Sequence, residues 1–114
     1  MDERERRLAE NEALFREVNE RTKGVNDAWT RVATDAPAFQ VVCECGREDC
    51  SLPLSVSVDL YEAVRSHGSR FFIARGHEFP EVETVVDDRH DLLVIEKIGA
   101  SKQYAERLDP RGRG

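Results

Sequence analysis

The first third of the chain has the pattern of a long amphipathic helix. Residues Asp2 to Lys23 contain neither proline nor glycine and are rich in Glu, Arg, Ala and Leu, which favour helices. Within and just after this stretch, one set of positions recurs at alternating spacings of three and four residues, which is typical of a coiled-coil seam with one polar Asn. These positions are Leu8, Asn11, Phe15, Val18, Thr22, Val25 and Trp29. Such a seam fits packing on the chain's own domain, on a twin helix or on a partner protein. Gly24 is able to interrupt the helix before Trp29.

The pattern changes at TDAP (34–37), where Pro37 disfavours helical geometry in the residue before it. Beyond this point, β-branched and aromatic runs predict short extended segments at 38–43, 53–57, 70–74, 81–86 and 92–98. The polar DDRHD between the last two segments suits a hairpin loop, although PEVETVV also fits a helical turn started by proline.

Two further helices are expected among these strands. Ser57 is placed to cap a helix over 58–66, which a left-handed glycine would end near Gly68. A closing helix is expected over 100–108, with Tyr104, Ala105 and Leu108 facing inward.

These elements predict an α+β fold, in which an N-terminal helical arm precedes a small antiparallel sheet carrying two helices. The expected boundaries are 1–33 for the arm, 34–38 for a linker, 39–108 for the α+β domain and 109–114 for a disordered tail.

Charge and hydropathy narrow the class of protein. Seventeen basic against 23 acidic side chains give a net charge of −6, which disfavours bulk attraction to nucleic acid without excluding a local basic patch. No apolar run approaches the 18 or so residues that cross a bilayer, and the first residues are charged where a signal peptide would be apolar. We therefore expect a cytoplasmic protein that does not bind membranes.

Three cysteines carry the most specific chemistry. In CECGREDC, Cys43, Cys45 and Cys50 come from one turn, and Gly46 allows the backbone to fold back. Three thiols in a reduced chain cannot pair completely as disulfides, whereas three thiolates suit tetrahedral zinc with one further donor. His77, in the Gly-His-Glu turn after a predicted strand, is the expected fourth ligand.

The other histidines have simpler explanations. His67 lies at a helix end, where it interacts favourably with the helix dipole, and His90 lies in a polar loop. The alternatives to zinc are unligated reduced cysteines, a redox switch or an iron–sulfur cluster.

A closed shell of three Cys and one His leaves no coordination position for an activated water, so we expect a structural zinc and no enzyme. The expected function is that of a small regulatory or adaptor protein, acting through its N-terminal helix on a protein partner or on itself. A zinc module that binds nucleic acid in transcription is one alternative. A small zinc hydrolase, with Glu78 as general base, is another and requires that His77 leave its position open.

Four stretches, ERRLAENEALFREVNER, FQVVCECGREDC, LYEAVRSHGSRFFIARGHE and LLVIEK, resemble a group of small, mostly uncharacterised proteins of high-GC Gram-positive bacteria. In that group a charged N-terminal helix precedes a C-E-C turn with a nearby third cysteine and then a G-H-E turn. The resemblance implies that Cys43, Cys45, Cys50 and Gly76-His77-Glu78 belong to one site, and it implies no activity.

Overall fold

The computed structural model of the chain describes residues 2–30 and 38–111, and the side chains of 25–30 are not among the parts described. The expected linker at 34–38 therefore lies outside the described residues except for Ala38, as do the side chains of Val25 and Trp29. The elements, in chain order, are α1 (Glu3–Thr30), β1 (Ala38–Val42), β2 (Pro53–Ser57), α2 (Val58–Arg65), β3 (Arg70–Ile73), β4 (Glu83–Asp88), β5 (Leu93–Lys97) and α3 (Gly99–Arg107).

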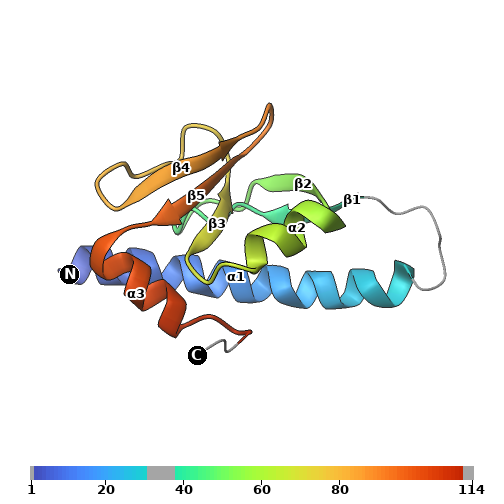
Figure 1. Ribbon diagram of the computed structural model, residues 1–114, viewed down its shortest axis with the longest axis horizontal. Helices are drawn as coiled ribbons and strands as arrows, with labels where there is room; N and C mark the ends of the chain where they lie inside the picture. The colour runs from blue at the N-terminus through green and yellow to red at the C-terminus, as the bar shows by residue number, and fades with distance from the viewer. Residues whose placement is uncertain (1, 31–37, 112–114) are drawn as a thin grey trace.

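The α+β class is confirmed, but the strands form two sheets where one was expected. Strands β1 and β2 pair antiparallel, and the other three form a second antiparallel sheet in the order β3-β5-β4. The chain passes from one sheet to the other at Cys43 and Glu44. The Cys43 N–H donates to the carbonyl of Leu52, the residue just before β2 (2.8 Å). The next N–H, that of Glu44, donates instead to the Phe72 carbonyl in β3 (2.7 Å). Figure 1 shows the two sheets lying over one side of α1.

Helix α2 begins as expected and ends differently. The Ser57 hydroxyl accepts a hydrogen bond from the Leu60 N–H, which makes Ser57 the N-cap. Gly68 does not supply a left-handed C-cap, because the helix ends at Ser66 in ordinary right-handed geometry and Gly68 has no positive φ. A Cβ at 68 would lie 2.8 Å from Oδ2 of Asp109, so a side chain at this position would displace the Asp109 carboxylate.

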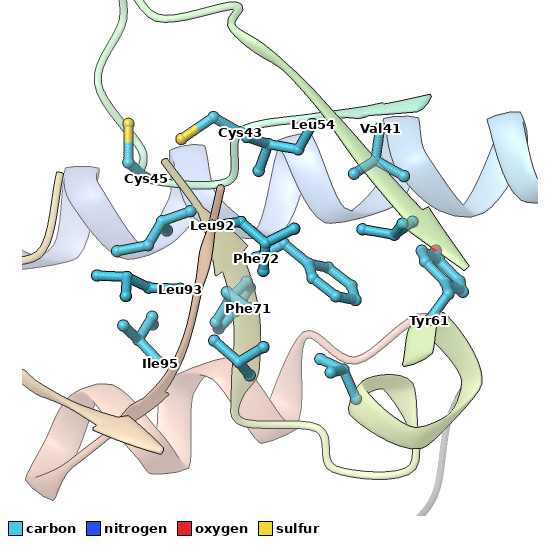
Figure 2. Packing of buried hydrophobic residues seen from close by; sticks show 14 of the residues in the cluster. Val41, Cys43, Cys45, Leu54, Tyr61, Phe71, Phe72, Leu92, Leu93 and Ile95 are labelled. Atoms are coloured by element: carbon cyan, nitrogen blue, oxygen red, sulfur yellow. The ribbon is translucent and has the colours of Figure 1, made fainter. Parts of the chain in front are cut away.

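The apolar core lies between the sheets and the helices (Figure 2). Phe71, Phe72 and Ile73 of β3 and Ile95 of β5 are fully buried. The Tyr61 ring of α2 stacks on Phe72, with 5.2 Å separating it from the Phe39 ring in a T-shaped contact. The core thus ties α2 to both sheets. In α3, Ala105 is buried as expected, but Leu108 is 37% exposed, so its inward orientation was predicted wrongly.

Helix α1 packs on this body through a polar face. Its buried side chains recur every three or four residues, one position away from the predicted apolar seam, and are Ala9, Glu12, Ala13, Arg16, Asn19 and Lys23. The seam itself is displaced to the flank of the helix, where Leu8 and Phe15 are half-buried and Val18 is 40% exposed. Burial of polar side chains at this interface requires a hydrogen-bond or ionic partner for each of them.

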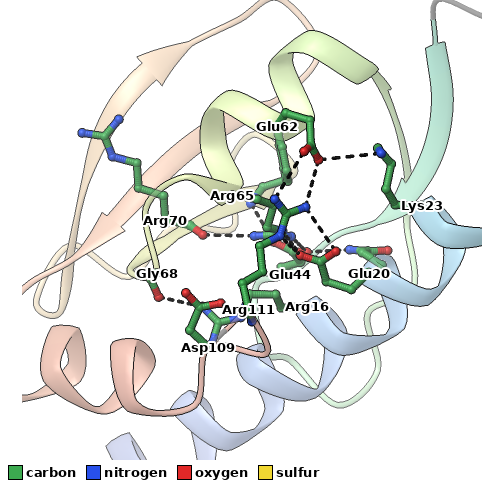
Figure 3. A network of polar contacts seen from close by, with 12 residues as sticks. Arg16, Glu20, Lys23, Glu44, Glu62, Arg65, Gly68, Arg70, Asp109 and Arg111 are labelled. Atoms are coloured by element: carbon green, nitrogen blue, oxygen red, sulfur yellow. Dashed lines mark hydrogen bonds and ion pairs between the residues drawn. The ribbon is translucent and has the colours of Figure 1, made fainter. Parts of the chain in front are cut away.

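Asn19 and Glu44 join α1 to the sheets. The Asn19 amide exchanges two hydrogen bonds with the backbone of Val42, at 2.8 and 2.9 Å, and donates to the Glu44 carboxylate at 2.6 Å. Glu44 also accepts the Phe72 N–H at 3.0 Å and pairs with the guanidinium of Arg65 from α2. One fully buried carboxylate therefore connects α1, α2 and β3 (Figure 3).

Two more buried cations fix α1 in place. Arg16 donates to the carbonyls of Gly68 (2.7 Å) and Ala105 (2.9 Å) and lies over the Phe71 ring. Lys97 donates to Glu12 (2.9 Å) and Glu83 (2.8 Å), all three being 1% exposed at their side chains. Neutrality of this triad requires one protonated carboxyl. Burial accordingly raises the pKa of Glu12 to about 8, with repulsion from Glu83 adding to the rise against the attraction of Lys97.

Near the chain end, Arg111 binds two glutamates on different helices. It donates to Glu20 of α1 (2.7 Å) and to Glu62 of α2 (2.9 Å), and Asp109 before it is buried. These exposed ion pairs add little stability each, but they bring residues 109–111 against both helices.

We predict that Glu44→Gln lowers the free energy of unfolding by about 3 kcal/mol, because it removes the fully buried carboxylate that pairs with the Arg65 cation and leaves the more distant Glu20, at 4.0 Å, as its partner. Chemical denaturation measures the loss. Glu48→Gln, at an exposed position in the same turn, is the matched control and should change stability by less than about 0.5 kcal/mol. Equal stability of the two variants would contradict the role given to Glu44.

We also predict that wild-type stability falls with rising pH relative to Glu12→Gln. Folding raises the Glu12 pKa from its ordinary value of 4.5 to about 8, so the contribution of its proton is complete below pH 4.5 and is lost as pH rises through 8. Between pH 6 and 9 the wild type should lose about 3 kcal/mol relative to the variant. Glu17→Gln, at an exposed position of the same helix, is the control and should follow the pH profile of the wild type. Parallel stability profiles for the wild type and Glu12→Gln would refute the prediction. So would a Glu17→Gln profile that differs from the wild type as much as that of Glu12→Gln.

Candidate metal centre

Two turns bring the four predicted ligands together. Cys43 directly follows β1, and the chain reverses after Cys45 through Gly46, whose φ of 84° suits glycine. Any side chain at 46 would also collide with Leu8 and Glu12 of α1. The second turn follows β3, where Gly76 has a φ of 91° and the His77 N–H donates to the Ala74 carbonyl (3.1 Å). Both turns end at the same edge of the core.

The donor atoms of Cys43, Cys45, Cys50 and His77 all lie within 4.8 Å of one another. Nδ1 of His77 is 3.6 Å from the sulfurs of both Cys43 and Cys50. Zinc bonds of about 2.3 Å to sulfur and 2.1 Å to nitrogen, at tetrahedral angles, separate a sulfur from a nitrogen by about 3.6 Å. The residues therefore fit a tetrahedral metal ion, and a small closure of the widest pairs would complete its geometry.

The surroundings stabilise thiolate ligands. The Ala74 N–H donates to the Cys43 sulfur at 3.1 Å, a contact that orients a metal-bound sulfur. The pKa of the Cys45 thiol is lowered to about 5, chiefly by a hydrogen bond from the Cys43 thiol and further by the Arg47 N–H and His77. The same hydrogen bond, with burial, raises the pKa of Cys43. A thiolate at neutral pH is what metal binding requires.

The centre lies at the boundary between core and solvent. Cys43 and Cys45 are buried at one end of the apolar cluster (Figure 2), whereas His77 is only half-buried. Cys50 and His77 line an open hollow of about 710 Å³, together with Arg47, Leu52 and others. A metal ion can therefore reach the donors from this side without opening of the core.

Other candidate ligands lie apart from this group. His67 and His90 are exposed. Within residues 2–30 and 38–111, the clustered metal-binding side chains are those of Cys43, Cys45, Cys50 and His77. Neither the other two histidines nor Glu78 belongs to this cluster. Glu48 and Asp49 are exposed on the turn.

Sequence reasoning missed the part that Glu44 has in this region. The alternation of an extended segment provides a signal, because a residue between two side chains that point one way must point the other way. Glu44 accordingly leaves the metal centre and enters the core, where a carboxylate needs buried donors. The same turn thus presents candidate metal ligands on one side and a carboxylate to the α1 interface on the other.

Comparisons with known proteins return no match: no family model, curated protein or solved structure resembles the chain significantly. Within the described residues, no helix has the length and apolar character needed to cross a membrane. The site must therefore be interpreted from its own geometry.

We predict that Cys45→Ser and His77→Ala each lose stoichiometric metal and melt at least about 10 °C below the wild type, because a structural ion contributes several kcal/mol. Metal analysis and thermal unfolding measure the two effects. His90→Ala removes an exposed imidazole and should keep both the metal and the melting temperature. Equal metal content and equal melting temperatures in all three variants would mean that the cluster binds no metal.

Proposed function

We propose that the protein is a small zinc-stabilised interaction module of the cytoplasm. The proposal of zinc rests on the donor set, because three thiolates and one imidazole at tetrahedral separations favour Zn²⁺ over harder ions such as Mg²⁺ or Ca²⁺. The cytoplasm is proposed because a reducing compartment keeps the three free cysteines available as ligands.

The single observation that favours a structural ion is the position of His77. Its Nδ1 occupies the fourth corner of the donor group, so a bound zinc would have four protein ligands and no site for a water molecule. A hydrolase of the kind considered above needs that position open. The ion would instead link the turn after β1 to the turn after β3, and so hold the two sheets together.

The outer face of α1 supports the interaction part of the proposal. Leu14 is 55% exposed and Val18 is 40% exposed, one turn apart, while the inner face of the helix is fully used by the body. Half-buried Phe15 lies beside them. Neighbouring exposed apolar side chains on a rigid helix are typical of protein-binding surfaces.

The nucleic-acid alternative has less support. Two of the arginines are buried inside the fold and so add nothing to a basic surface. Arg16 donates to a backbone carbonyl, and Arg65 pairs with the carboxylate of Glu44. Binding to nucleic acid would have to overcome a net charge of −6.

We predict that a photo-crosslinking residue, benzoylphenylalanine, forms specific protein adducts in cells when placed at Leu14 or Val18. The same residue at Val85, which is 44% exposed on β4, is the matched control. Single positions are used because deletion of α1 would remove buried parts of the fold. The absence of adducts from 14 and 18, or the same adducts from 85, would contradict an interaction through the outer face of α1.

A further inference from the structure

The outer face of α1 carries a self-complementary pattern of charge and apolar side chains. Along it lie Glu10, Leu14, Val18 and Arg21, at spacings of four, four and three residues, and all four are exposed. In Figure 1, α3 and the segment that follows it cover part of α1 on the side away from the sheets, and Arg111 in that segment bonds to Glu20 of α1. We infer that this face binds a second copy of the chain, with the two α1 helices antiparallel. The inference rests on the proposed function only in using the same face.

The pattern matches itself in one antiparallel register. If a two-fold axis crosses the helix pair level with position 16, each Leu14 lies opposite Val18 of the second copy. Glu10 of each copy then comes within reach of Arg21 of the other. The interface is thus isologous, with two apolar contacts and two ion pairs of opposite charge.

Other pairings of the same two helices bring like charges together. An axis level with Leu14 would place Arg7 opposite Arg21 of the second copy and Glu10 near its Glu17. A parallel pair would place each charged side chain beside its own equivalent. Like charges across a helix pair are destabilising, so the register level with position 16 is favoured.

The structure around the face is compatible with this partner. Beside Leu14, a hollow of about 280 Å³ is lined by Ala13, Tyr104 and Leu108 among others, and offers apolar surface to a facing helix. Glu17 also lines this hollow, on the α3 side of the pattern. The Glu10 carboxylate accepts the Tyr104 hydroxyl at 3.1 Å and lies 3.8 Å from Arg6, and the Glu10 side chain remains 48% exposed.

Sedimentation equilibrium of the zinc-loaded full chain, up to about 1 mM, tests the inference, since so small an interface predicts weak association. The wild type should form dimers and no larger species. Leu14→Glu should be monomeric over the whole range, whereas Val85→Glu should associate as the wild type does.

A charge exchange tests the antiparallel register. Glu10→Arg and Arg21→Glu should each weaken dimerisation about tenfold by placing like charges together, and the double variant should restore it to within about threefold of the wild type. Circular dichroism of each variant verifies that the fold is retained.

Three results would overturn the inference: a monomeric wild type at every concentration, dimers that survive Leu14→Glu, or a double variant no stronger than the single ones. A monomeric wild type whose positions 14 and 18 still crosslink to another protein would reject the second copy and leave the proposed function in place. Loss of zinc in the wild type would instead reject the proposed function.

Discussion

Residues 43–45 join the separate parts of this molecule because their side chains alternate between two environments. The sulfurs of Cys43 and Cys45 face the group completed by Cys50 and His77, while the carboxylate of Glu44 faces the core. One side of the segment therefore connects the turns that follow β1 and β3, and the other side connects α1, α2 and β3. Displacement of this short segment would disturb both sets of contacts at once.

The interface of α1 shows why such positioning matters. Buried charges and amides stabilise a fold only where every partner is in place, and they penalise alternative dockings of the helix. Asn19 fits the backbone of Val42 at one register alone, and Arg16 must reach two carbonyls from different elements. A polar inner face thus fixes the orientation of α1, and this orientation leaves Leu14 and Val18 on the outside.

Local chemistry made most elements predictable from sequence, and long-range contacts account for the failures. Helix α1, the Ser57 cap and the hairpin of β4 and β5 depend on nearby residue patterns. The union of the three cysteines with His77 is a long-range contact, 27 and 34 residues from Cys50 and Cys43, and it was predictable because three thiolates need a fourth donor. The inner face of α1 was not predictable from hydrophobicity, because Glu12 and Arg16 are polar and find their buried partners far along the chain. Glu12 pairs with Lys97, 85 residues away, and Arg16 donates to Gly68, 52 residues away. The left-handed cap predicted at Gly68 is absent, because α2 already ends at Ser66 in right-handed geometry.

X-ray absorption spectroscopy at the zinc edge, on protein purified without added metal, tests most directly whether a zinc ion joins the two turns. The geometry predicts one zinc per chain, with about three sulfur neighbours near 2.3 Å and one nitrogen near 2.1 Å. A protein that folds with no bound metal, or an ion surrounded by oxygen atoms, would show that the thiol turn is held in some other way.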